Sequence, residues 1–345
     1  MRNLKRALSL ALASVMLLGM MVVGTSASYT DVDSKANLEA IEVLKLVGVM
    51  TGDDKGNFNP DANVTRNEMA VIMCNLLRLK AGCTPPFTDV PAWAAPYVAA
   101  CYNNGIIAGV SADKFNGDAN VTAVQAGLMV MKALGYFGFA GEFGDNWKLS
   151  VVKQANKIDL YDGINAYTDQ VLTRNDVAQL VLNALKTPTV EAEKDGQDIK
   201  VNGVIISSNV KYNYITSKKD YATAIDDKQS SNSDGTKLNG FTVELGEKLY
   251  QGDLKMYEDR SDDFGRPGTR WTYKTTTIGT YSDTPAATYT AKMSKDDLYD
   301  LMGKADEDTL YQPGASDADA AAARKVLLRE RHRVVGKVVD DFDRN

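Results

Sequence analysis

The sequence predicts an α + β protein of several domains, with an N-terminal pseudo-threefold bundle of helices followed by a small β-rich domain. An internal repeat predicts the bundle: FNPDANVT at residues 58–65 returns as FNGDANVT at residues 115–122. Short helical units cannot cover their own apolar faces, so repeated copies must pack into a shared core. After residue 198 the apolar residues change from helical spacing to alternation, which predicts strands.

The first 27 residues have the pattern of a secretory signal peptide. Arg2, Lys5 and Arg6 form a basic start, residues 7–23 are uncharged and apolar, and small residues follow at 25–27. The alternative is a retained membrane anchor, but the run is shorter than the roughly 20 residues that a spanning helix needs. We therefore expect cleavage after residue 27 or 28, giving an exported protein with no membrane partner.

Composition excludes some classes of protein. With 44% apolar and 24% charged residues in 345, the chain is expected to fold into two domains after the leader. A net charge of -6 argues against a nucleic-acid partner, because such proteins carry a basic bias. Cys74, Cys83 and Cys101 are too few for a disulfide framework, although a bridge between Cys83 and Cys101 remains open.

Three copies of the repeat are predicted, at residues 29–80, 87–136 and 142–187. Each reads as helix, loop and helix, because apolar residues in its second half follow the i, i+3, i+4, i+7, i+8 spacing of an amphipathic helix. These stripes are expected to converge on one core. They are Met69, Ile72, Met73, Leu76 and Leu77; Ala126, Met129, Val130, Ala133 and Leu134; and Val177, Leu180, Val181, Ala184 and Leu185.

The start of each second helix carries a capping signal, in which a threonine hydroxyl bonds the N3 amide and the N3 side chain bonds the cap amide. The third pair should be weaker, because its carboxylate is shorter. The pairs are Thr65 with Glu68, Thr122 with Gln125, and Thr173 with Asp176.

Arg66 and Arg174 follow two of these caps and oppose the helix macrodipole, an unfavourable placement worth about 0.3–1 kcal/mol. We interpret them as anion-binding residues, because a guanidinium grips a carboxylate through two hydrogen bonds. The second copy has Ala123 instead, which predicts a weakened site there. The alternative is pairing with surface acids such as Asp61 or Asp169.

Glycines and tryptophans mark further positions. Gly52 and Gly109 follow first helices and are expected to reverse the chain with a left-handed backbone. Trp93 and Trp147 are interpreted as core anchors, with a flat platform for a sugar ring as the alternative. The acidic loop at residues 53–57 lacks the spacing of a calcium-binding EF-hand, and we expect no metal and no cofactor.

Together these motifs resemble the S-layer homology domain family, across about half of the mature chain. The resemblance rests on Phe/Tyr-x-Asp-Val, Trp93, the Gly-Ile-Ile-x-Gly of residues 105–109, the Phe-Asn-Pro of residues 58–60 and the Thr-Arg-Asn-Glu of residues 65–68, in three copies after a signal peptide. It implies a helical bundle that binds secondary cell-wall polysaccharide, often through a pyruvate ketal on a sugar.

The resemblance also implies which residues bind the polysaccharide. The arginines would hold the ketal carboxylate, and the motif aspartates and glycines would complete the grooves. The third copy lacks a clean Phe-x-Asp opening, with Asp145 only a loose candidate. The residues are Arg66, Arg174, Asp31, Asp89, Gly52, Gly109 and Gly163, with Trp93 and Trp147 as the possible platforms.

The rest of the chain reads as a polar linker at residues 188–198, a β-rich domain at 199–303 and an Arg-rich tail at 304–345. Strands are expected within 201–210, 241–245 and 271–278, and a helix near 294–301. The tail is a partner-binding helix, a disordered end or a replaced terminus.

We expect a non-catalytic protein displayed on the cell surface, with cell-wall polysaccharide and other S-layer or surface proteins as partners. The chain's one histidine, His332, lies in the tail, which leaves both domains without the commonest general base. The alternative is a surface hydrolase acting on glycans, for which the adjacent Asp262 and Asp263 are a candidate pair of catalytic acids.

Overall fold

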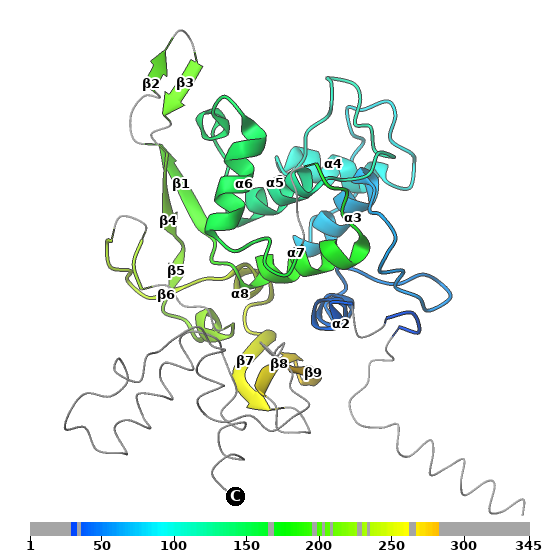
Figure 1. The fold of residues 1–345 in the computed structure, drawn as a ribbon, viewed down its shortest axis with the longest axis vertical. Coiled ribbons are helices and arrows are strands. Elements are labelled where there is room, and N and C mark those ends of the chain that lie inside the picture. Colours follow the sequence, from blue (N-terminus) through cyan, green and yellow to red (C-terminus); the bar gives the residue numbers. More distant parts are fainter. Residues whose placement is uncertain are drawn as a thin grey trace, which may run out of the picture. The chain divides into compact units, whose positions relative to one another are not determined.

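The computed structural model describes residues 29–32, 36–164, 169–194, 199–201, 204–207, 210–225, 230–232, 235–261 and 267–282. The expected signal peptide, the helix near 294–301, the acids Asp262 and Asp263 and the tail lie outside these residues. The described part is a mixture of helices and small sheets (Figure 1). No helix within it is long and apolar enough to cross a bilayer.

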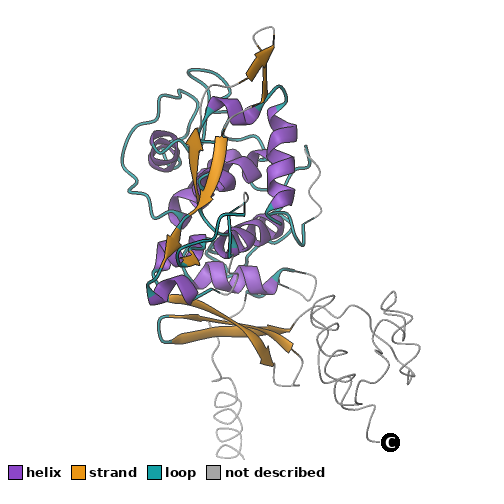
Figure 2. Ribbon diagram, turned by 90° about the vertical axis from the view of Figure 1, so that its left-hand side faces the viewer, coloured by secondary structure: helices purple, strands orange, loops and turns teal. Residues whose placement is uncertain are grey.

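Seven α-helices and nine short strands make up the described part, shown by type in Figure 2. The helices are α2 (Leu38–Leu46), α3 (Arg66–Leu76), α4 (Ala95–Asn103), α5 (Ala123–Leu134), α6 (Trp147–Lys157), α7 (Arg174–Lys186) and α8 (Leu245–Tyr250). The strands are β1 (Val190–Lys194), β2 (Ile199–Val201), β3 (Val204–Ser207), β4 (Val210–Tyr214), β5 (Thr216–Ser217), β6 (Phe241–Thr242), β7 (Leu254–Ser261), β8 (Pro267–Tyr273) and β9 (Thr276–Ser282).

The six helices α2 to α7 follow the predicted order of helix, loop and helix in each copy. The first helix of a copy packs on the second helix of another copy: α4 packs on α3, α6 on α5, and α2 on α7. The predicted apolar stripes supply much of the core, with Met69, Val130 and Val181 among the fully buried side chains. Because α2 returns to α7, the six helices form a closed set rather than an open row.

The segments before the second helices of the three copies are joined by backbone hydrogen bonds. Val64 N–H donates to Leu172 O at 3.0 Å, Val121 N–H to Val64 O at 2.8 Å, and Leu172 N–H to Val121 O at 3.1 Å. Each segment therefore donates to one neighbour and accepts from the other. A second cycle runs the opposite way, from Arg66 to Ala119, from Ala123 to Gln170 and from Arg174 to Ala62. We call these segments, residues 62–66, 119–123 and 170–174, the junction.

The predicted caps form in full in the first and third copies, whereas in the second the buried Thr122 hydroxyl has no hydrogen-bond partner among the described residues. Glu68 accepts from the Thr65 amide at 2.7 Å, and Gln125 accepts from the Thr122 amide at 3.2 Å. Asp176 accepts from the Thr173 amide at 2.9 Å and also from its hydroxyl. The shorter carboxylate thus forms a full capping box, and the expectation that the third pair is weaker was wrong.

The predicted linker and two predicted strands need correction. The strand expected within 241–245 is reduced to β6, and α8 begins at Leu245. Residues 190–194 form β1, which pairs antiparallel with β4, so this part of the linker is ordered sheet. The expected strand at 271–278 is interrupted: Lys274 has a φ of 55° and its amide donates to Asp253 O, so the chain turns between β8 and β9. A polar alternating sequence does not distinguish one strand from two joined by a turn.

The chain divides into two compact units, residues 1–256 with 271–279, and residues 257–270 with 280–345. This division does not follow the boundary predicted at residues 188–198. In the first unit, the buried Trp271 donates from its indole nitrogen to the Glu39 carboxylate at 2.6 Å. This bond joins residues 271–279 of that unit to α2. The remaining domain boundaries stay predictions.

Candidate functional site

Arg66 is the first residue of α3 and binds a loop of the second copy. Its Nε donates to Phe115 O at 3.1 Å and its Nη2 to Ala108 O at 3.0 Å. Its Cζ lies 4.5 Å from the centre of the Phe115 ring, a cation–π contact. Only 7% of the residue is exposed, and this burial lowers the pKa of the guanidinium.

Arg174 repeats this arrangement between the third copy and the first. Its Nε donates to Phe58 O at 2.7 Å and its Nη2 to Thr51 O at 2.8 Å, with Cζ 4.7 Å from the Phe58 ring centre. Thr51 and Phe58 occupy the positions of Ala108 and Phe115 in the repeat. This arginine is only half-buried.

These contacts explain why two cations occupy the first turn of a helix. The carbonyl oxygens of a neighbouring loop offset the unfavourable macrodipole, so an anion is not required to account for them. The alternative partners Asp61 and Asp169 are not used: Asp169 forms an ion pair with Lys148 at 2.5 Å. Among the described residues, the Nη1 of each arginine has no hydrogen-bond partner.

Asp31 and Asp89 bind the same two loops through their backbone amides. Asp89 accepts from the Phe115 and Asn116 amides at 2.8 and 2.9 Å, and Asp31 accepts from the matching amides of Phe58 and Asn59. The Phe115 amide bond lowers the pKa of Asp89. Aspartate and arginine therefore both bind the backbone of each loop, the first accepting from its amides and the second donating to its carbonyls.

The second copy lacks the arginine, and a tyrosine occupies the equivalent region. Tyr161 donates its hydroxyl to Ala123 O at 2.9 Å in a buried setting. The Tyr161 ring also packs against Gly127, where a Cβ would meet its hydroxyl. This third contact is neutral, because a phenol is uncharged near pH 7 and burial raises its pKa further. The structure thus contains two guanidinium contacts and one phenol contact.

The tryptophans and glycines differ from expectation. Trp93 is 55% exposed and Trp147 37%, so neither is a core anchor. Gly52 and Gly109 do not have positive φ; the left-handed positions are Gly48 and Gly105, four residues earlier. At Gly109 the Phe87 ring leaves no room for a side chain, since a Cβ would lie 2.4 Å from its Cε1. Gly163 does adopt a positive φ, of 71°.

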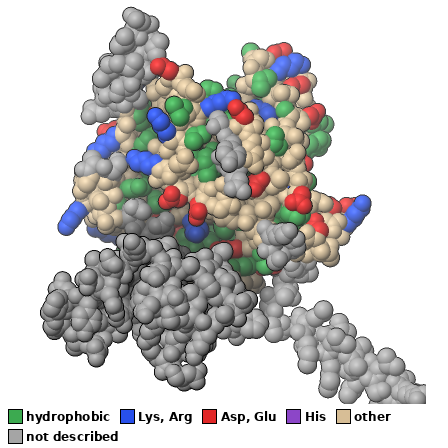
Figure 3. Space-filling model, in the orientation of Figure 1, with side chains coloured by type: hydrophobic (Ala, Val, Ile, Leu, Met, Phe, Trp, Pro, Cys, Tyr) green, Lys and Arg blue, Asp and Glu red, His purple; other side chains and the backbone are tan. Residues whose placement is uncertain are grey.

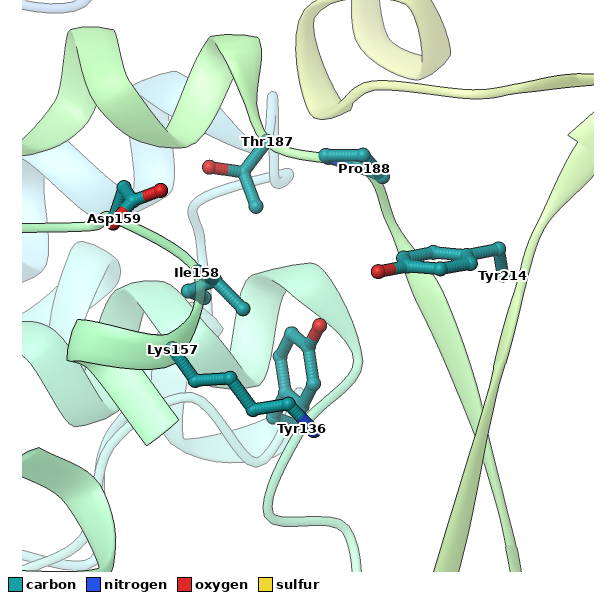
Figure 4. A pocket seen from close by; sticks show the side chains of 7 residues that line it. All are labelled: Tyr136, Lys157, Ile158, Asp159, Thr187, Pro188 and Tyr214. Atoms are coloured by element: carbon teal, nitrogen blue, oxygen red, sulfur yellow. The ribbon is translucent and has the colours of Figure 1, made fainter. Parts of the chain in front are cut away.

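The structure also contains a pocket that the sequence did not predict (Figure 4). Two adjoining hollows of about 160 and 340 Å³ share Tyr136, Lys157, Ile158 and Tyr214. They lie where α6 ends, beside the paired strands β1 and β4. The one signal was the alternation in β4, since residues two apart in a strand point to the same face and this places Tyr212 and Tyr214 together.

Figure 3 shows basic and acidic side chains mixed over one face, without a large area of a single charge. A ligand of many negative charges would therefore find no broad basic surface on the atoms coloured there.

The model of the S-layer homology domain matches residues 28–70 and 86–122. These segments cover most of the first predicted copy and most of the second; the third copy lies outside them. The chain is 25% identical to a cell surface protein of Thermoanaerobacter kivui over 77% of its own length and 36% of the relative's. It is 32% identical to the surface-layer 125 kDa protein of Lysinibacillus sphaericus over 50% of its length and 16% of the relative's.

A further relative is an endoglucanase of Bacillus sp. strain KSM-635, 28% identical over 39% of this chain and 16% of the enzyme. The chain therefore spans about a third or less of the length of these relatives. The chain contains S-layer homology sequence, and this sequence together with the surface proteins among its relatives indicates a location at the cell wall or cell surface.

Proposed function

We propose that this chain is a non-catalytic surface protein held to the cell wall by three S-layer homology copies that form a pseudo-threefold bundle. The closed packing of the six helices and the cyclic hydrogen bonds of the junction support the third copy and the symmetry. The ligand proposed is secondary cell-wall polysaccharide carrying a carboxylate, such as a pyruvylated sugar.

The proposal depends above all on Arg174. Its Nε and Nη2 are fixed by loop carbonyls, whereas Nη1 is unpartnered within the described residues and the side chain is half-exposed. A guanidinium that is already immobilised loses little further entropy when it binds a carboxylate. Arg66 presents the same Nη1 edge of its guanidinium, but at 7% exposure it is less accessible to a ligand.

The neighbouring charges favour modest affinity. Arg174 lies within electrostatic reach of Glu68, Asp31 and Asp53, which compete with an incoming anion for the cation. A polymer with many equivalent sugars compensates, because two weak sites on one rigid body can raise avidity about 100-fold or more. Added salt should weaken this attachment.

The test is binding of the exported chain to purified walls, compared between the natural protein and Arg174→Gln. Losing a hydrogen bond to a charged group should weaken binding about 10-fold or more. Lys148→Gln is the matched control, because it removes the same charge from an exposed side chain elsewhere. Walls from which the polysaccharide has been extracted should bind neither protein.

Because Arg174 also supports the first copy's loop, folding must be measured alongside binding. Near-ultraviolet circular dichroism at the binding temperature identifies a folded Arg174→Gln protein. If that folded variant binds walls as tightly as the Lys148→Gln control, the assignment of Arg174 is incorrect. Binding to extracted walls would instead exclude the polysaccharide as the ligand.

The endoglucanase relative supports a second candidate, a surface hydrolase acting on glycans. It is tested by measuring the release of reducing sugar from soluble glucans by the full chain. Turnover above the level of heat-denatured protein would replace the non-catalytic proposal.

A further inference from the structure

The pocket beside α6 has the chemistry of a binding site that is separate from the arginine-bound loops. It shares no residue with the contacts of Arg66 or Arg174. Its larger hollow, about 340 Å³, lies at the lower end of the ~300–1,000 Å³ range of pockets for small organic ligands. A ligand of one ring fits this size better than an extended chain does.

Aromatic rings and hydrogen-bonding groups alternate around the pocket. Tyr136 and Tyr214 line both hollows, and Figure 4 shows the Tyr214 hydroxyl turned into the space that Tyr136 also faces. Gln154 and Asn232 add side-chain amides: Gln154 bonds Tyr136, and the Asn232 oxygen accepts from the Tyr214 amide, which leaves the Asn232 NH₂ as a donor. Such a lining suits a sugar ring, whose C–H face packs on an aromatic ring while its hydroxyls point outward to polar groups.

The charges at the pocket specify an uncharged sugar. Lys157 and Asp159 both line the smaller hollow and are exposed to solvent. One cation and one carboxylate give no net charge, and together they can donate to and accept from neighbouring hydroxyls. An acidic sugar would gain from Lys157 but would be repelled by Asp159.

The walls of the pocket are fixed by contacts outside it. Glu142 accepts from the Phe137 and Phe139 amides at 2.6 Å each and from the Tyr212 hydroxyl, so β4 is fastened to the chain that follows α5. Tyr212 packs edge-on against Tyr136 at 4.6 Å between ring centres. Asn232 Oδ1 accepts from the Tyr214 amide at 2.9 Å. The lining is therefore preorganised, which lowers the entropic cost of binding.

We propose that this pocket is a second carbohydrate site, which binds a single uncharged sugar ring between Tyr214 and the end of α6. The probes are glucose and N-acetylglucosamine, with glucuronate as the charged comparison. A ligand of this size in an open pocket should bind with a dissociation constant on the order of 1 mM, from a ligand efficiency of about -0.3 kcal/mol per atom.

Saturation-transfer NMR on the full exported chain measures the affinity for each sugar. Tyr214→Ala should weaken binding of the uncharged sugars roughly 3- to 10-fold by removing the ring. Lys157→Gln, at an exposed position that cannot disturb the core, should weaken it by a smaller factor. Tyr102→Ala is the matched control, because Tyr102 is 41% exposed and lies in the second copy, outside the pocket.

Arg174→Gln separates this inference from the proposed wall attachment, since it should leave the affinity for glucose unchanged. The inference is overturned if both uncharged sugars bind with dissociation constants well above about 10 mM, that is, about 10-fold or more weaker than the expected affinity. It is also overturned if Tyr214→Ala and Lys157→Gln both bind as the natural protein does, or if glucuronate binds more tightly than glucose.

Discussion

Two positions, four residues apart after each first helix, have different structural roles. Gly48, Gly105 and Asp159 each take the left-handed turn after a first helix, with φ of 77°, 71° and 52°. Aspartate tolerates this conformation better than most residues do, which allows the third copy to dispense with glycine. Four residues later, Gly52 and Gly109 serve a different purpose, since each leaves space for an aromatic ring.

Gly109→Ala should therefore destabilise the protein through steric overlap and not through backbone strain. The new Cβ would lie 2.4 Å from Phe87 Cε1 and 2.5 Å from Ser111 O, so the expected cost is about 1–3 kcal/mol in the free energy of unfolding. Gly138→Ala is the control, since its Cβ would meet no atom within 4 Å. Urea denaturation measures both, and equal stabilities would contradict the close approach.

At the scale of the element, an aspartate and an arginine hold the backbone of each of two loops. The first copy's loop, residues 51–59, carries an additional acceptor in Asp53, whose carboxylate accepts from the Lys55 and Asn57 amides and the Asn59 side chain. These bonds, led by that from the Asn57 amide, lower the pKa of Asp53 to about 2. The loop is thus organised by carboxylates, although it lies at the surface.

The loop should lose order in acid. Because the folded pKa of Asp53 lies below its unfolded value of about 3.9, the stabilisation is complete above that value. It is lost as the pH falls through about 2. NMR titration should show the Lys55 and Asn57 amides shifting with a midpoint near the folded value. Asp53→Asn should abolish the titration and Asp54→Asn should preserve it; a midpoint near 4 would contradict these contacts.

The elements of the copies could largely be predicted from the sequence. Caps, apolar stripes and the order of helix and loop are local signals, and the Thr65, Thr122 and Thr173 caps all begin helices. The partners of Arg66 and Arg174 could not be predicted. They are backbone carbonyls of another copy, and every residue type carries the same carbonyl. The pocket was missed for a different reason: it combines the end of α6 with β4 and with Val190 of β1, which lies in the segment assigned to a linker.

On the scale of the whole molecule, a closed set of helices couples parts that are far apart in sequence. The first helix, α2, packs on the last helix of the set, α7, and the backbone cycles of the junction pass through all three copies. A mutation that loosens the packing of α2 should therefore destabilise α7 of the third copy more than α3, the second helix of its own copy.

Leu44→Ala tests this coupling. Leu44 is fully buried in α2, so its truncation should cost about 2–5 kcal/mol. Hydrogen exchange should then rise in α7 more than in α3. Leu38→Ala is the control, on the same helix at 40% exposure, and should change little. A greater rise in α3 than in α7 would show that the copies fold as independent units.

The Tyr161 contact makes the three interfaces between the copies unequal, because it is a phenol contact whereas the other two involve a guanidinium. In the proposed pseudo-threefold bundle, two of the interfaces are therefore charged and the third is neutral. A protein bound to the wall through its two charged interfaces would adopt a single orientation there. Every molecule on a surface would then present the same side outward.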